Sequence, residues 1–119
     1  GQQDRGVASE ASNLRENKVT PKLSIGHNER NNRGRYWTVT NAGEAELVYS
    51  LGPENRMVIN STFVPIDARG SGVAHALVAR AVEDAKAVGR KVDPVCPYVD
   101  RVFDRHPEWR DLRAPALAG

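Results

Sequence analysis

The fold is decided by the stretch TFVPIDARGSGVA at residues 62–74, which continues into an amphipathic run ending at Val88. β-Branched and aromatic residues come first, two glycines follow, and apolar residues then recur at helical spacing, which predicts a strand, a loop and a helix. Gly70 and Gly72 lack a Cβ, so the backbone can take positive φ and approach a ligand closely. The first N–H groups of the helix stay free, and with the helix dipole they favour an anion there.

The composition is typical of one soluble domain. The chain has 119 residues, of which 39% are hydrophobic and 27% charged, and its mean hydropathy is −0.55. This length supports one hydrophobic core, and no apolar run reaches the length that a bilayer requires. The net charge of +2 is too small for a dedicated nucleic-acid arm. Because Cys96 is the only cysteine and no signal-like start is visible, we expect a cytoplasmic protein.

The chain divides into three parts by composition. Residues 1–20 are polar, with scattered apolar positions, and we expect a flexible arm; within it, 8–17 could instead form a short helix on a partner. Residues 21–113 carry the periodic patterns of a single domain. Residues 114–119 are expected to be a frayed tail.

Short extended segments separated by turn residues precede the glycine loop. They predict an antiparallel meander with strands at 23–27, 35–40, 46–51 and 56–64. Residues 28–34 are expected to form a polar loop. In the last strand, Met57, Ile59, Ser61 and Phe63 are expected to share one face.

After the loop, the pattern predicts a helix over 73–88, in which Arg80 and Asp84 pair and which Gly89 ends with a left-handed cap. Residues 91–95 are expected to form a short strand parallel to 56–64, because a helical crossover joins the two, and Pro94 suggests that it is splayed. Pro97 suits the first position of a last helix that ends before His106.

The glycine loop lacks the Gly-Lys-Ser/Thr of a P-loop and the full dinucleotide fingerprint, so an ATPase or dehydrogenase is disfavoured. Arg69-Gly70-Ser71-Gly72-Val73-Ala74, following an antiparallel meander, instead resembles the R/Q-x-x-G-x-G/A acyl-CoA loop of the GNAT acetyltransferase superfamily. FVP at 63–65, CP at 96–97 and HPEW at 106–109 resemble a subfamily of very short GNAT-like proteins with a Cys-Pro pair. The resemblance covers roughly residues 23–112.

The resemblance implies an α+β fold, with a mixed sheet in which the meander leads into a β-loop-α-β crossover between splayed parallel strands. It also implies acetyl-CoA or another acyl-CoA as cofactor. Backbone N–H groups of the loop would hold the diphosphate, and the pantetheine arm would lie between strands 56–64 and 91–95. The expected cofactor-binding residues are Phe63, Val64, Arg69, Gly70, Ser71, Gly72, Val73 and Ala74.

The same resemblance gives three candidate catalytic residues. Cys96 would stand near the thioester, where it is an acyl-accepting nucleophile, a lining residue or simply a small buried hydrophobe. Tyr98 would donate a proton to the leaving thiolate, or is a half-buried tyrosine. Ser61 stands where the short subfamily commonly has histidine, and a serine without a basic partner cannot accept a proton near neutral pH.

Each of the three histidines has an ordinary structural interpretation beside any functional one. His27, His75 and His106 show no metal-ligand spacing, so we expect no metal site; His75 could bind a phosphate or be an exposed helix residue, and His106 is expected to cap a helix end.

Two clusters of charged residues and two tryptophans are further candidates for contacts with a ligand or for ordinary structural roles. The basic cluster of Arg30, Arg33 and Arg35 is a solvated turn or a contact for the 3′-phosphate of CoA. A solvated helix face is the expectation for four further residues, Asp100, Arg101, Asp104 and Arg105. The two tryptophans are expected to be core or groove-covering aromatics.

The leading functional hypothesis is an acyltransferase that binds acetyl-CoA or another acyl-CoA and moves the acyl group to an unidentified amine on a small molecule or a protein. The alternative is a non-catalytic CoA or acyl-CoA binding module, suggested by Ser61. A nucleic-acid binder is the least favoured, because no arginine-rich helix or series of stacking aromatics is present.

Overall fold

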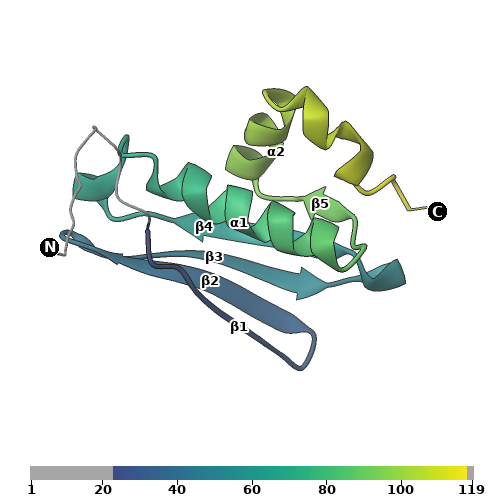
Figure 1. Ribbon diagram of the computed structural model, residues 1–119, viewed down its shortest axis with the longest axis horizontal. Helices are drawn as coiled ribbons and strands as arrows, with labels where there is room; N and C mark the ends of the chain where they lie inside the picture. The colour runs from purple at the N-terminus through teal and green to yellow at the C-terminus, as the bar shows by residue number, and fades with distance from the viewer. Residues whose placement is uncertain (1–22, 118–119) are drawn as a thin grey trace, which may run out of the picture.

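The computed structural model describes residues 23–117, which form a five-stranded sheet covered by helices on one face (Figure 1). The strands lie side by side in chain order and are β1 (Gly26–Arg30), β2 (Arg33–Thr40), β3 (Gly43–Leu51), β4 (Met57–Phe63) and β5 (Val92–Pro94). The first four are antiparallel, and β5 is parallel to β4. The expected α+β architecture is therefore confirmed. The expected arm at 1–20 lies outside the described residues.

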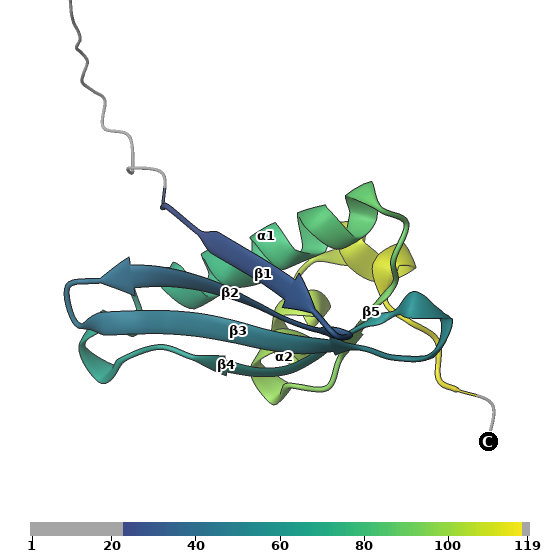
Figure 2. The same cartoon turned by 90° about the horizontal axis from the view of Figure 1, so that it is seen from below.

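The helices are α1 (Val73–Ala87) and α2 (Pro97–Asp104), with short 3₁₀ helices η2 (Pro53–Asn55), η3 (Ile66–Ala68) and η4 (Pro107–Leu112). Seen from below in Figure 2, the sheet lies in front and both main helices lie behind it. Within residues 23–117, no helix has both the length and the apolar character needed to cross a membrane.

The first hairpin differs from the expectation of a loop at 28–34. Strand pairing continues to Arg30 opposite Arg33, and the chain turns on Asn31 and Asn32 alone. These two residues have φ of 55° and 63°, as in the two-residue turns that match strand twist. The prediction was wrong because β1 is an edge strand whose residues are mostly exposed, so it has no buried face to create an alternating pattern.

A β-bulge interrupts β4. Val48 pairs with Ser61, but the next residue, Tyr49, pairs with Ile59, so Asn60 is an extra residue with no partner on β3. A bulge of this kind shifts the side-chain alternation by one position.

Because the bulge shifts the alternation, the prediction that Ser61 and Phe63 share a face with Ile59 is wrong. Ile59 faces the core before the bulge, whereas Thr62 takes that direction after it, opposite the fully buried Leu47. Directly opposed residues of an antiparallel pair share a face. Ser61 and Phe63 therefore lie on the open face of the sheet, away from the helices.

The core lies between α1 and the sheet. α1 contributes the predicted apolar stripe, which packs against buried residues of the three central strands, and the fully buried side chains include Tyr36, Leu47, Tyr49, Ile59, Leu77, Val78 and Val82. The helix ends one residue earlier than predicted, and Gly89 has the expected positive φ of 75°.

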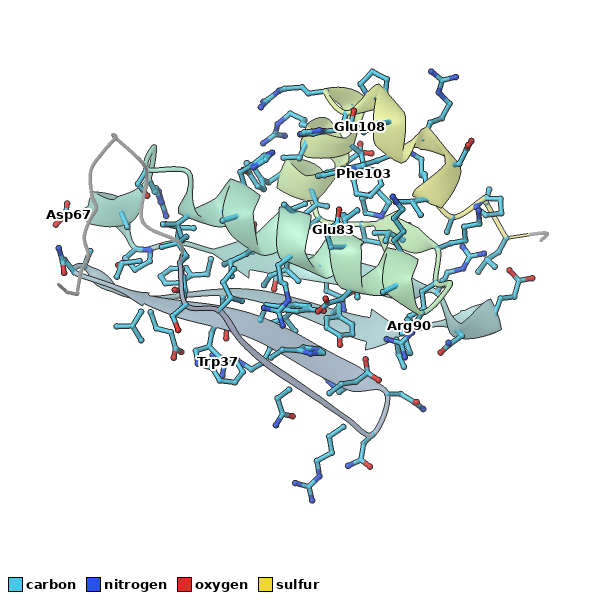
Figure 3. The ribbon with its side chains drawn as sticks, in the orientation of Figure 1. Trp37, Asp67, Glu83, Arg90, Phe103 and Glu108 are labelled. Atoms are coloured by element: carbon cyan, nitrogen blue, oxygen red, sulfur yellow. The ribbon has the colours of Figure 1, made fainter. Side chains whose placement is uncertain are left out.

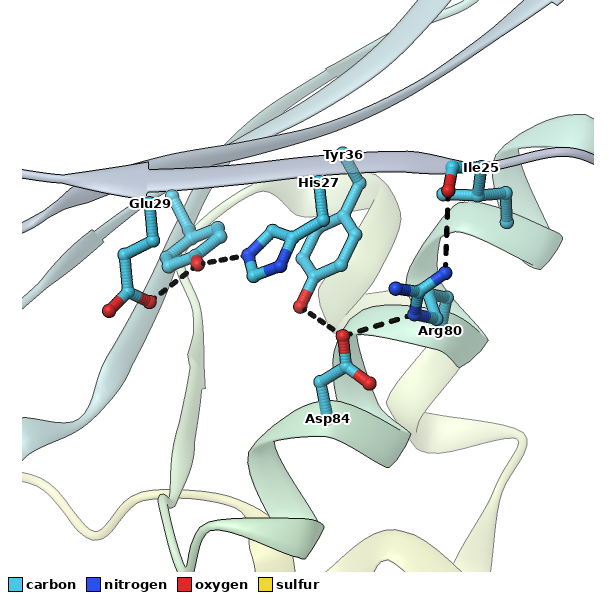
Figure 4. A network of polar contacts seen from close by, with 7 residues as sticks. Ile25, His27, Glu29, Tyr36, Arg80 and Asp84 are labelled. Carbon is cyan, nitrogen blue, oxygen red and sulfur yellow. Dashed lines mark hydrogen bonds and ion pairs between the residues drawn. The ribbon is translucent and has the colours of Figure 1, made fainter.

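Polar contacts also tie α1 to the sheet (Figure 4). The hydroxyl of Tyr36 donates to Asp84 at 2.8 Å, and Arg80 donates to the same carboxylate oxygen at 3.0 Å, which confirms the predicted pair one turn apart. Beside them, the Tyr49 hydroxyl donates to Glu29 at 2.7 Å. Arg90, just beyond α1, binds Glu29 at 2.7 Å, and these two bonds lower the pKa of Glu29 to about 2.

The end of the domain closes over β5. Arg113 forms a parallel bridge with Val92, and the N–H of Ala114 donates to the Val92 carbonyl at 2.7 Å. The buried Arg56 donates to the carbonyl of Pro115 at 2.9 Å. The first residues of the segment expected as a frayed tail therefore contact the sheet.

Candidate functional site

β4 and β5 separate after a short parallel contact. They pair only where Met57–Ile59 faces Val92–Pro94. The N–H of Cys96 then donates to the Ile59 carbonyl at 2.9 Å, and beyond this bond no strand within 23–117 pairs with that side of β4. Pro94 has no N–H to continue the ladder, and Pro97 begins α2, so the chain turns away from the sheet here.

A groove of about 610 Å³ opens beside the separated strands. It runs from the end of β4 past the glycine loop to the first turn of α1, and α2 forms its other wall. Seven of the eight predicted cofactor-binding residues line it, namely Phe63, Val64, Arg69, Gly70, Gly72, Val73 and Ala74. The lining also includes four residues with polar side chains, Thr62, His75, Tyr98 and Arg101.

The glycine loop borders this groove with its backbone. Gly70 and Gly72 have φ of 81° and 89°, which side chains other than glycine rarely adopt. The first helical hydrogen bond joins the N–H of Ala76 to the carbonyl of Gly72. In the described part of the chain, the N–H groups of residues 70–75 have no acceptor among backbone or side-chain atoms. Free donors at a helix start favour a diphosphate.

Two side chains stabilise the loop from within. Arg69 donates from Nε to the carbonyl of Val64 at 3.1 Å, which links the two ends of the loop. The Ser71 hydroxyl donates to the carbonyl of Ala68, and this residue does not line the groove. The geometry thus gives Arg69 and Ser71 a role in shaping the loop.

Cys96 lies at the point where the two strands part. The residue is 6% exposed, and its sulfur is 3.6 Å from the Thr62 hydroxyl. Burial raises the pKa of the Cys96 thiol, but the N–H groups of Val99 and Tyr98 and the Thr62 hydroxyl together lower it further than burial raises it. The pKa of Cys96 is therefore below its usual value, as suits a thiolate.

The other two candidate catalytic residues have different surroundings. Tyr98 is half-buried and lines the groove one turn or less from Cys96. Ser61 lies on the open face of β4 beyond the bulge at Asn60, and it does not line the groove. Thr62, which the sequence analysis did not single out, takes the place facing the thiol. Its position could be found only from the strand register.

A pair of histidines stands at the other end of α2. His75 is exposed, as expected, but its Nε2 lies 3.0 Å from Nε2 of His106. Nδ1 of His106 lies 2.7 Å from the carboxylate of Glu108, and Trp109 stacks on the His106 ring with centroids 4.0 Å apart. Figure 3 shows Glu108 and Phe103 on the helical side of the molecule, with Trp37 on the far side of the sheet. No local sequence pattern predicts this pairing, which joins residues 31 positions apart.

The charged residues of the first loop and of α2 make specific contacts in the structure. Arg35 pairs with Glu44 and Glu46 and lies over the Trp37 ring, and none of the first loop's arginines lines the groove. On α2, Arg101 lines the groove. The carboxylates of this helix face away from it, since Asp100 and Asp104 both pair with Arg113.

The sequence of this domain matches a known protein family. The sequence model of the family of GCN5-related N-acetyltransferases matches residues 35–112 of this chain. The chain belongs to this family. Acetyl-CoA is the usual acyl donor of these N-acetyltransferases.

A solved structure agrees on the fold. The ribosomal-protein-alanine N-acetyltransferase from Brucella melitensis biovar Abortus 2308 superposes with a TM-score of 0.52, covering 76% of this chain and 67% of that one at 15% sequence identity. At this identity the likeness concerns the fold alone. No curated protein matches the chain significantly.

Proposed function

We propose that this protein binds acetyl-CoA along the groove and transfers the acetyl group to an amine. The observation that carries the proposal is the single continuous groove that joins the free amides of the glycine loop to Thr62, beside the point where β4 and β5 part. Cys96 does not itself line the groove, but its sulfur contacts the hydroxyl of Thr62, which does.

The binding role of each part follows from its chemistry. The N–H groups of residues 70–75 hold the diphosphate, and Arg69 keeps their loop in shape. The pantetheine arm carries amides, which pair with the backbone edge of β4 around Phe63 and Val64 in place of a strand. The thioester then lies beside Thr62 and Cys96.

In direct transfer, the acceptor amine attacks the thioester carbonyl carbon. A carbon–nitrogen bond forms and the carbon–sulfur bond breaks, so that CoA leaves as a thiolate. Tyr98 supplies a proton to this thiolate, and the amine loses one to solvent.

In covalent transfer, the Cys96 thiolate attacks the same carbon first and CoA leaves. The amine then attacks the acyl-Cys96 thioester and releases the cysteine thiolate again. The lowered pKa of Cys96 and its contact with Thr62 favour this route. Because Cys96 is only 6% exposed and does not line the groove, the acyl group would have to reach its sulfur past Thr62.

A second candidate function is a CoA-binding module without turnover. One observation favours it: no carboxylate lines the groove in residues 23–117, and its only imidazole, His75, belongs to the end away from Cys96. The acceptor must therefore arrive as the free amine, or no transfer takes place.

The test measures binding and turnover separately. Calorimetry with CoA establishes binding, and release of free CoA thiol from acetyl-CoA across a panel of small amines and peptide N-termini establishes transfer. Transfer that survives in Cys96→Ala supports the direct route, and an acetyl group found on Cys96 by mass spectrometry supports the covalent one. Binding without thiol release supports the module, and no binding of CoA refutes the proposal.

A further inference from the structure

Glu108, His106 and His75 form a chain of side chains that reaches the groove. The carboxylate of Glu108 contacts Nδ1 of His106 at 2.7 Å, and the two imidazoles meet through their Nε2 atoms at 3.0 Å. Trp109 stacks on His106, and Phe103 meets the Trp109 ring edge-on at 5.2 Å. The His106 ring is thus fixed on three sides, and only His75 of the pair lines the groove.

The pair belongs to the anion-binding end of the groove. His75 lies in the first turn of α1, and its own N–H is among the free amides. His106 follows α2, whose eight residues place it roughly 12 Å along the helix from Cys96. The histidines therefore lie far from the thiol and close to the place of a phosphate.

Hydrogen bonding fixes where protons can sit on this chain. A carboxylate only accepts, so Nδ1 of His106 carries a hydrogen, and this bond lowers the pKa of Glu108 below its usual value. In the neutral pair, Nε2 of His106 then accepts from Nε2 of His75, which leaves a lone pair on Nδ1 of His75. One added proton turns this last nitrogen into a donor, and an anion in the groove favours the donor state.

We propose that the His75–His106 pair takes up one proton when a phosphate group binds in the groove, so that the affinity for the ligand depends on pH through these two residues. This inference rests on the proposed function and adds a linkage to the same site. Binding is expected to weaken as the pH rises, because the pair is then neutral and offers no donor at Nδ1 of His75.

Other charged or hydroxyl-bearing side chains lie around the pair. Arg69, Tyr98 and Arg101 line the same groove as His75, and Asp104 and Arg110 line a hollow beside His106. Of all these side chains and Glu108, only the two imidazoles belong to a type that titrates near neutral pH.

The test is calorimetric titration of the full chain with CoA at several pH values between about 6 and 8, in buffers of different ionisation heat. Wild-type protein should take up to one proton more per CoA than His75→Gln and His106→Gln, whose amides bond without titrating. The excess should appear as a Kd that rises with pH by up to about tenfold per unit more in wild type than in the variants.

Two controls isolate the pair. The phosphate monoester of CoA itself titrates near pH 6, but it does so equally in every protein, so only differences count. Arg101→Gln, which removes a permanent charge from the same groove, should weaken binding at every pH without changing the proton count. Equal proton uptake by wild type and both histidine variants overturns this inference alone. No CoA binding by wild type at any pH overturns it together with the proposed function.

Discussion

Single residues act in this groove mainly through backbone conformation and short contacts. Gly70 and Gly72 hold positive φ, and a Cβ built on either would meet no atom within 4 Å. Space is therefore available for a side chain at both positions, and only the backbone conformation requires glycine.

Gly72→Ala should accordingly cost about 1–2 kcal/mol of unfolding free energy, the penalty of a left-handed backbone for a residue with a Cβ. It should also weaken CoA binding, because relaxing φ turns the first-turn amides away. Gly89 is a matched control at the other end of α1, with φ of 75° and equally open surroundings. Gly89→Ala should lose similar stability in chemical denaturation and bind CoA normally. Equal loss of binding in both variants would speak against a specific role for the loop.

The hydroxyl of Thr62 lowers the pKa of Cys96, and valine can replace this threonine with almost no change in side-chain shape. Thr62→Val deletes a hydroxyl that stabilises the thiolate, so the pKa of Cys96 should rise. The pH profile of Cys96 alkylation should then shift to higher pH. Ser61→Ala changes a neighbouring hydroxyl on the opposite face and should leave the profile where it is. An unchanged profile in Thr62→Val would show that the amides of α2 alone set the thiol's acidity.

At the scale of elements, the sequence predicted what local periodicity controls. The apolar stripe of α1, its closing Gly89 and the parallel β5 were found because each has a signal within a few residues. The bulge at Asn60 was missed, since it is defined by pairing with β3 and not by its own strand. The contact of His75 with His106 was missed for the same reason, because the start of α1 and the residue before η4, far apart in sequence, bring these rings together.

The edge strand β1 is attached by ionic and hydroxyl contacts, which makes part of the domain's stability depend on acid. Glu29 has a pKa of about 2 in the folded protein, below its ordinary value of 4.5. Its contribution is therefore present above about pH 4.5 and is lost as the pH falls toward 2.

Glu29→Gln should remove this dependence. Its unfolding free energy should be lower than that of wild type by about 1 kcal/mol near neutral pH, since the pair with Arg90 is partly exposed to solvent. The difference should shrink toward zero as the pH approaches 2. Urea titrations of both proteins across this range measure it, and a gap that stays constant with pH would contradict the assignment.

The segment after η4 holds the C-terminal end of the domain against Arg56 and the edge of β5. Arg56 is 3% exposed and donates to Pro115, while Ala114 bonds to the edge of β5. Removing residues 113–119 leaves a buried cation short of an acceptor and should cost about 2–3 kcal/mol. Removing only 116–119 retains these bonds and should leave the melting temperature nearly unchanged. Equal melting temperatures for the two truncations would show that the segment adds no stability.

Beyond Ile59, β4 has one edge that no strand covers within residues 23–117. Such an edge is a template on which another molecule can add a strand, and this is a common start of aggregation. An acyl-CoA arm in the gap would occupy the same backbone positions. Ligand supply would thus also govern the solubility of this protein, and concentrated samples should scatter less light when CoA is present.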